Sequence, residues 1–165
     1  MPFMPLNDTR SQPNKDRARP SAMAIALGEA RVAGERGEVP VGAVIVSADA
    51  AVIARAGNRT RELDDPTAHA EMLAIRDACK QIGSERLIDC DLYVTLEPCP
   101  MCAAAISLAR VRRVYYAASD PKTGGIEQGP RIFSHSTCHH TPEVYSGIGE
   151  SEAAALLRNF FASKR

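Results

Sequence analysis

Four residues have the side-chain types and the spacing of a metal-dependent hydrolytic site. His69, Cys99 and Cys102 offer one imidazole and two thiolates, a ligand set that zinc prefers. The two cysteines are three residues apart at the start of an expected helix, so they project toward one point. Three protein ligands leave the fourth tetrahedral position to water, as in catalytic zinc sites. Glu71, two residues after His69, is the candidate general acid and base.

Both groups of ligands lie near expected helix starts. Asp65 and Pro66 predict a cap and a first helical residue for a helix over 65–82, and Pro100 predicts the start of a second helix. The positive ends of these helices would stabilise the thiolates. Residues i and i+2 of a regular helix do not share a face, so the spacing alone does not explain how His69 and Glu71 could both face one ion.

The rest of the chain alternates helical and strand patterns. The order αββαβαβ(β)α predicts an α/β fold, a three-layer α/β/α sandwich on a mixed five-stranded sheet. The expected helices are 21–36, 65–82, 100–109 and one from 150, and the expected strands are 41–47, 51–57, 91–96, 112–117 and 143–146. A long loop, 119–141, separates the last two strands, and loops of that length in a domain of this size are usually functional or mobile.

Composition narrows the class of protein. The chain has 165 residues, of which 45% are hydrophobic and 24% charged, with a formal net charge of zero. These values predict a globular protein. The zero net charge gives no indication of a polyanionic partner, although residues 110–165 are net basic. No apolar run approaches the roughly 20 residues of a membrane span. Five cysteines with one CxxC favour a cytoplasmic metal protein over a disulfide framework. Prolines and few large apolar side chains in 1–20 predict a disordered tail.

Two short motifs carry a resemblance to a known family. HAE at 69–71 followed by PCPMC at 98–102 resembles the signature known for the zinc-dependent cytidine and nucleobase deaminase superfamily. Within it, bacterial tRNA adenosine deaminases are similar in EVPVGAVIV (38–46), GNR (57–59), DPTAHAEMLAIR (65–76), RLIDCDLYVTLEPCPMCAAAI (86–106), DPKTG (120–124) and LLRNFF (156–161). The resemblance covers about 21–163. It implies a cytidine deaminase-like fold and one zinc-dependent deaminase domain over 21–165.

The resemblance also assigns the zinc site. It implies that His69, Cys99 and Cys102 bind one Zn²⁺ per chain. Glu71 would carry a proton from water to the ring nitrogen of the substrate and then to the departing ammonia.

Five further positions are candidate substrate-binding residues. Asn58 matches the family asparagine that hydrogen-bonds the target base, and its amide offers both a donor and an acceptor. The main chain of Ala70 would line the pocket floor. Asp120 and Lys122 lie in the loop that approaches the RNA backbone in the family. Of the ring pair at 160–161, one ring is expected to pack inward, and we assign Phe160 to stacking on a base.

Three functions follow from these residues. The first, which the resemblance implies, is hydrolytic deamination of adenosine to inosine at the wobble position (34) in the anticodon loop of an arginine tRNA, by a homodimer. The second is deamination of a free nucleobase or nucleoside, guanine or cytosine, because PCPMC is shared by guanine deaminases. The third is a non-catalytic, zinc-stabilised RNA-binding module.

One segment departs from the family pattern. The family has a leucine- or methionine-rich stretch after KTG, where this chain has GIEQGPRIFSHSTCHHTPEVY (125–145). His140 matches a family histidine, whereas His139 stands where asparagine is typical. Cys138, His139 and His140 could supply a fourth ligand and close the zinc site. We expect them instead to pack as part of the loop.

Overall fold

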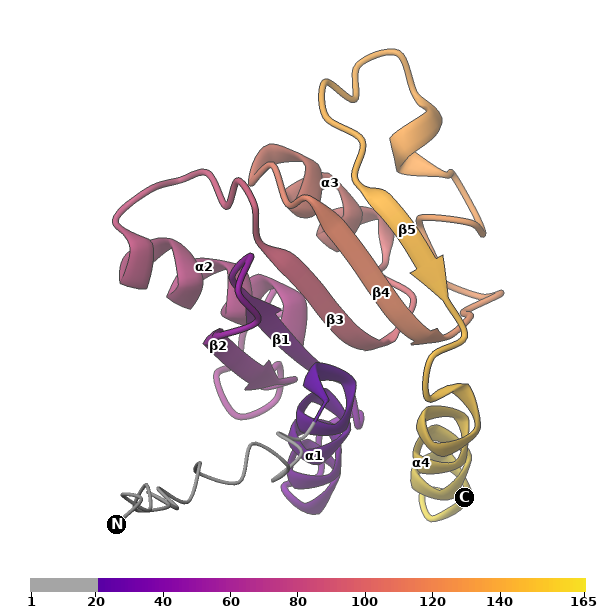
Figure 1. The fold of residues 1–165 in the computed structure, drawn as a ribbon. Helices are drawn as coiled ribbons and strands as arrows, with labels where there is room; N and C mark the ends of the chain where they lie inside the picture. Colours follow the sequence, from indigo (N-terminus) through magenta and orange to yellow (C-terminus); the bar gives the residue numbers. More distant parts are fainter. Residues whose placement is uncertain (1–20) are drawn as a thin grey trace, which may run out of the picture.

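The computed structural model describes residues 21–165 (Figure 1), so the tail predicted for 1–20 lies outside the described residues. The order of elements is α1 (Ala22–Glu35), β1 (Gly42–Val46), β2 (Val52–Gly57), α2 (Ala70–Ile82), β3 (Asp91–Leu96), α3 (Pro100–Leu108), β4 (Arg113–Ala118), the 3-10 helix η1 (Ile132–Ser134), β5 (Glu143–Ser146) and α4 (Glu150–Ala162). Each strand and helix expected from the sequence is present. Ser21 caps α1, accepting a hydrogen bond from the main-chain N–H of Ala24 at 3.1 Å.

The five strands form one mixed sheet in the order β2-β1-β3-β4-β5. β1 is antiparallel to both β2 and β3, whereas β3, β4 and β5 run parallel to one another. The parallel strands need crossover connections. α3 connects β3 to β4, and η1 and the long loop connect β4 to β5. The carboxyl end of β3 therefore leads directly into the PCPMC segment.

Helices cover both faces of the sheet, as Figure 1 shows. On one face, Val44 and Val46 of β1 pack with Met23 and Leu27 of α1 and Ala153 of α4. On the opposite face, the alternate side chains of β1 pack with α2 and α3 in the larger core cluster. The predicted three-layer α/β/α sandwich is confirmed.

The predicted start of α2 is wrong by four residues. The helix begins at Ala70, not at Pro66. Asp65 Oδ1 instead accepts hydrogen bonds from the main-chain N–H of Thr67 at 2.8 Å and from its hydroxyl at 2.7 Å. Such a local turn competes with helix formation. Because α2 begins at Ala70, His69 is its N-cap residue and lies outside the regular helix.

The apolar side chains of α4 are only partly buried. Ala153 is buried and Leu156 packs against the core, but Phe161 is 50% exposed. No helix of the described residues is long and apolar enough to cross a bilayer.

Candidate metal centre and substrate site

Three potential ligands, 30 and 33 residues apart in the chain, meet where two helices begin. His69 is the N-cap of α2, Cys99 is the N-cap of α3, and Cys102 is the third residue of α3. The Nδ1 atom of His69 lies 3.6 Å from the Cys99 sulfur and 3.5 Å from the Cys102 sulfur. All three donor atoms lie within 4.8 Å of one another, so one ion could contact all of them.

Backbone conformation at the two caps directs the ligands toward each other. His69 (φ −72°, ψ 152°) and Cys99 (φ −67°, ψ 170°) are both extended, and neither side chain caps its own helix. Because His69 precedes the helix, the rule that i and i+2 diverge does not apply to His69 and Glu71. The convergence that the spacing could not explain therefore comes from the later start of α2.

The protonation of the two thiols also suits a dication. The hydrogen bond between Cys99 and Cys102, together with the nearby His69, lowers the pKa of the Cys99 thiol to about 4. The same hydrogen bond, together with burial, raises the pKa of Cys102. One thiolate is thus present before metal binding, and a bound ion would displace the second proton. An imidazole and two thiolates at the positive ends of two helices fit Zn²⁺.

Glu71 is the second residue of α2 and is almost completely buried, with 4% of its surface exposed. Burial raises its pKa to about 7. A carboxyl group with a pKa near neutrality can both accept and return a proton at physiological pH. The side chain beside the metal ligands therefore has the acid–base property of a proton carrier.

Asn58 connects the end of β2 to the start of α2. Its Oδ1 atom accepts a hydrogen bond from the main-chain N–H of Ala70 at 2.8 Å. This bond caps α2 in place of His69. Among the described residues, the Asn58 amide nitrogen donates to no protein acceptor, so it is available to a ligand. Asn58 and Ala70, both predicted to contact the substrate, are therefore bonded to each other beside the metal ligands.

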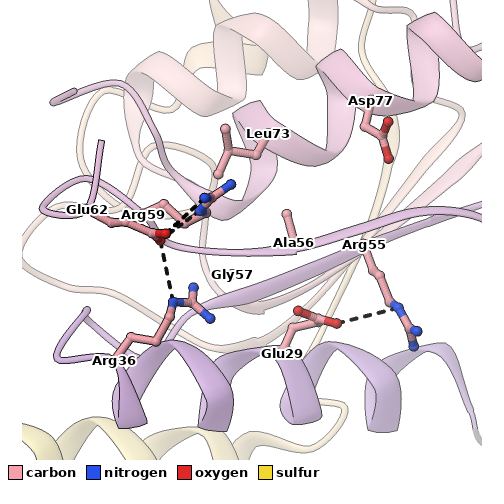
Figure 2. Close-up of a pocket in the computed structure, with 9 residues that line it drawn as sticks. All are labelled: Glu29, Arg36, Arg55, Ala56, Gly57, Arg59, Glu62, Leu73 and Asp77. Atoms are coloured by element: carbon pink, nitrogen blue, oxygen red, sulfur yellow. Dashed lines mark hydrogen bonds and ion pairs between the residues drawn. The ribbon is translucent and has the colours of Figure 1, made fainter. Parts of the chain in front are cut away.

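A network of charged side chains holds the segment that carries Asn58. A pocket lies at the outer edge of β2, between α1 and α2, and its lining residues are drawn in Figure 2. Its volume is about 480 Å³. In it, Glu62 pairs with Arg59 at 2.8 Å and with Arg36 at 3.7 Å. Arg36 also donates to the carbonyl oxygen of Asn58 at 3.1 Å. None of the three metal ligands lines this pocket. We therefore interpret its charged residues as a support for the segment that carries Asn58.

The other predicted substrate residues are more scattered. Asp120 accepts hydrogen bonds from the N–H groups of Lys122 (3.1 Å) and Thr123 (3.0 Å), which makes it the organiser of a tight turn. Lys122 is exposed on that turn. Phe160 lies near the end of α4, in the layer opposite α2 and α3, edge-on to Phe161.

Cys138, His139 and His140 do not join the metal ligands. Cys138 and the carbonyl oxygen of His140 contact the Ser107 hydroxyl near the end of α3, at 3.3 and 2.6 Å. The His140 ring bonds the carbonyl oxygen of Val111 at 2.6 Å. Within residues 21–165, the group of potential ligands contains three members only, so the fourth position stays open, as a catalytic ion requires.

Two buried carboxylates were missed from the sequence. Glu38 and Glu97 are each 2% exposed and accept main-chain N–H groups from two loops beside the site. Glu38 binds the amides of Arg61 and Glu62. The available sign was an acidic residue one or two positions before a proline and beside an apolar stretch, VPVGAVIV after Glu38 and LYVTL before Glu97.

Comparison with known proteins gives a consistent picture. Residues 17–118 match the cytidine and deoxycytidylate deaminase zinc-binding region. A tRNA-specific adenosine deaminase of Agrobacterium fabrum is 66% identical over 87% of this chain and 93% of its own length. A solved structure from a study of A-to-I editing by tRNA:A34 deaminases is 65% identical, with a TM-score of 0.82 over 84% of this chain and 100% of that one. A guanine deaminase of Nitrosomonas europaea is 25% identical, with a TM-score of 0.76 over 88% and 85%.

Proposed function

The chain belongs to the tRNA-specific adenosine deaminases, within the family that has the cytidine and deoxycytidylate deaminase zinc-binding region, and from this premise we propose that it converts adenosine to inosine at the wobble position of a tRNA. It is a zinc-dependent hydrolytic deaminase. The observation that carries the proposal is the buried Glu71 carboxyl beside an open set of one histidine and two cysteine ligands.

The residues divide the reaction among them. His69, Cys99 and Cys102 hold zinc, which when bound supplies a Lewis acid that lowers the pKa of water toward neutrality. Glu71 accepts a proton from the water that attacks C6 of the base and delivers it to N1. It then takes the remaining proton from the new C6 hydroxyl group and delivers it to the amine, which leaves as ammonia as the bond between C6 and the amine nitrogen breaks. Adenosine and water thus give inosine and ammonia. The free amide nitrogen of Asn58 donates to an acceptor on the base edge and orients it.

Further parts of the proposal concern the substrate loop and the whole chain. Residues 21–165 act as one deaminase domain in the cytoplasm, on the anticodon loop of an arginine tRNA. Lys122 contacts the RNA backbone from the turn held by Asp120, and Phe160 stacks on a flanking base.

We also infer that two chains associate. Leu108 of α3 is 78% exposed and Ile88 is 61% exposed, the two highest fractions among the large apolar side chains of residues 21–165. Leu108, Ile132 and Ala104 help to line a hollow of about 480 Å³ on the outer side of α3. Burial of this surface in a homodimer would remove it from water. A single species with the mass of one chain in solution would contradict this.

A second candidate substrate is a free base. The PCPMC motif and the similarity to a guanine deaminase support it. The higher identity to tRNA-specific deaminases favours RNA. The non-catalytic module has no support among these relatives, which are named as enzymes.

An inosine assay on an arginine tRNA with anticodon ACG, run beside ammonia release from guanine, cytosine and adenosine, tests the proposal. We expect inosine at the wobble position only. Ammonia from a free base with the tRNA unchanged would contradict the RNA assignment. The variant Glu71→Ala is the control: turnover should disappear while one zinc per chain and the fold remain. Loss of zinc instead would contradict the role of Glu71 in proton transfer.

A further inference from the structure

Glu97 is a buried carboxylate that the reaction does not use. It follows β3 directly, is 2% exposed, and lies two residues before the ligand Cys99. None of the ion pairs within residues 21–165 includes Glu97. A buried carboxylate without a cationic partner must be stabilised by hydrogen bonds.

Those hydrogen bonds all come from one loop. Oε2 of Glu97 accepts three successive main-chain N–H groups, from Ile126 at 3.2 Å and from Glu127 and Gln128 at 2.9 Å. Oε1 accepts the Ser119 hydroxyl and the N–H of Asp120, both at 3.2 Å. Successive amides around one oxygen form an anion-binding concavity. Here the anion is a side chain of the protein, so residues 119–128 wrap around Glu97.

Two glycines allow the loop to approach the metal-bearing turn closely. A Cβ atom on Gly124 would lie 2.7 Å from the Glu97 carboxyl carbon, and one on Gly125 would lie 2.5 Å from the Pro100 nitrogen. The N–H of Gly125 donates to the carbonyl oxygen of Pro98 at 2.8 Å. The loop is therefore attached to the turn that carries Cys99 in two ways, through the Glu97 carboxylate and through the main-chain carbonyl of Pro98.

We propose that Glu97 is a positioning residue that fixes the 119–128 loop against the Cys99 turn and so sets the affinity for the RNA around the target base. The proposal rests on the proposed function. Glu97 acts through Lys122, the exposed cation of this loop. Glu97 accepts a hydrogen bond from the main-chain N–H of Asp120, and the Asp120 carboxylate accepts one from the main-chain N–H of Lys122. Loosening the loop would displace this cation from the phosphates while the zinc ligands and Glu71 remain in place.

The test is the variant Glu97→Gln in the zinc-loaded full chain, compared with wild type on the arginine tRNA. Glutamine keeps the shape but presents an NH₂ group to donors, which leaves at least one of them without an acceptor. We expect one zinc per chain, kcat within about threefold, KM raised about tenfold or more, and faster hydrogen exchange at the amides of 126–128. Gly124→Ala, which presses on Glu97 from the loop side, should act in the same direction and serves if Glu97→Gln does not fold.

Glu38→Gln is the matched control, because Glu38 is equally buried and also accepts loop amides. It should leave the exchange of 126–128 unchanged. Unchanged exchange in Glu97→Gln would overturn the proposal, as would an unchanged KM or a loss of zinc. If the wild-type chain leaves the tRNA unmodified, the proposed function fails, whereas the exchange rates still report whether Glu97 holds the loop.

Discussion

The helices α2 and α3 each have a metal ligand at the N-cap position, but the first main-chain N–H group is dealt with differently in the two helices. Each begins after an extended N-cap residue, His69 or Cys99, whose side chain turns to the ion and not to its own helix. In α2 the N–H of Ala70 then needs an acceptor, and Asn58 supplies it. In α3 the first residue is Pro100, which has no N–H.

This difference has a functional consequence. The α2 solution brings a neutral amide from the end of β2 to the site, and its unused NH₂ group can bind a base. The α3 solution needs no neighbouring side chain, so the outer side of the turn is free to hold the 119–128 loop through Glu97. In the proposed function, the start of α2 thus contributes to base recognition, and the start of α3 holds the protein loop 119–128 that we propose to contact the RNA.

Removal of a ligand from either helix tests whether the two starts form one site. We expect His69→Ala and Cys99→Ala each to lose the bound zinc and to reduce turnover by at least about 1,000-fold, because each leaves only two protein ligands. Zinc per chain by atomic absorption and inosine formation check this. Retention of zinc in one of the two variants would show that the helices do not contribute equally.

Glu71 at the start of α2 should be required for catalysis but should reduce the stability of the zinc-free protein at high pH. Burial raises its folded pKa from 4.5 to about 7, so folding favours the neutral carboxyl group. The zinc-free protein should therefore lose stability, on the order of 1–3 kcal/mol, as the pH rises through this window. Glu71→Gln should be inactive but should not show this loss, so at pH 8 it should be the more stable zinc-free protein. Urea unfolding in the presence of a chelator at pH 5 and pH 8 measures the difference, and parallel pH curves for the two proteins would refute the assignment.

Substitutions of Asn58 should separate its two functions, the cap of α2 and the amide donor to the base. Asn58→Ala removes both the cap and the amide donor, and we expect about 1–2 kcal/mol less unfolding free energy together with a lower kcat/KM. Asn58→Asp keeps an oxygen for the Ala70 N–H but has no NH₂ donor. It should recover stability and not kcat/KM. Recovery of both would mean that the cap alone matters.

Pro100 should give the smallest effect of the set. In Pro100→Ala the new N–H appears at a position where helices commonly leave it without an intrahelical partner, so we expect a loss below about 1 kcal/mol and full zinc content. Thermal unfolding of the zinc-loaded protein measures it. A loss as large as that of Asn58→Ala would remove the contrast between the two helix starts.

Much of this arrangement could be predicted from residue types and local spacing. The ligand set, the acid–base residue and the five strands follow from short motifs and from hydrophobic periodicity over five to fifteen residues. The start of α2 could not be predicted in this way, because Asp65 and Pro66 suit a helix start as well as they suit the turn that Asp65 forms with Thr67. The cap by Asn58 and the loop around Glu97 depend on partners 12 to 31 residues away.

The sequence by itself determined which groups are present: one imidazole, two thiolates, a carboxyl group and an amide, and the elements that carry them. Only the tertiary structure decided that they meet, because the parallel pairing of β3 with β4 and the antiparallel pairing of β1 with β3 set where α2 and α3 begin relative to each other. Register and burial are cooperative properties of the whole sheet and its helices. They turn Glu71 into a carboxyl group with a pKa near neutrality and Glu97 into the anchor of a loop.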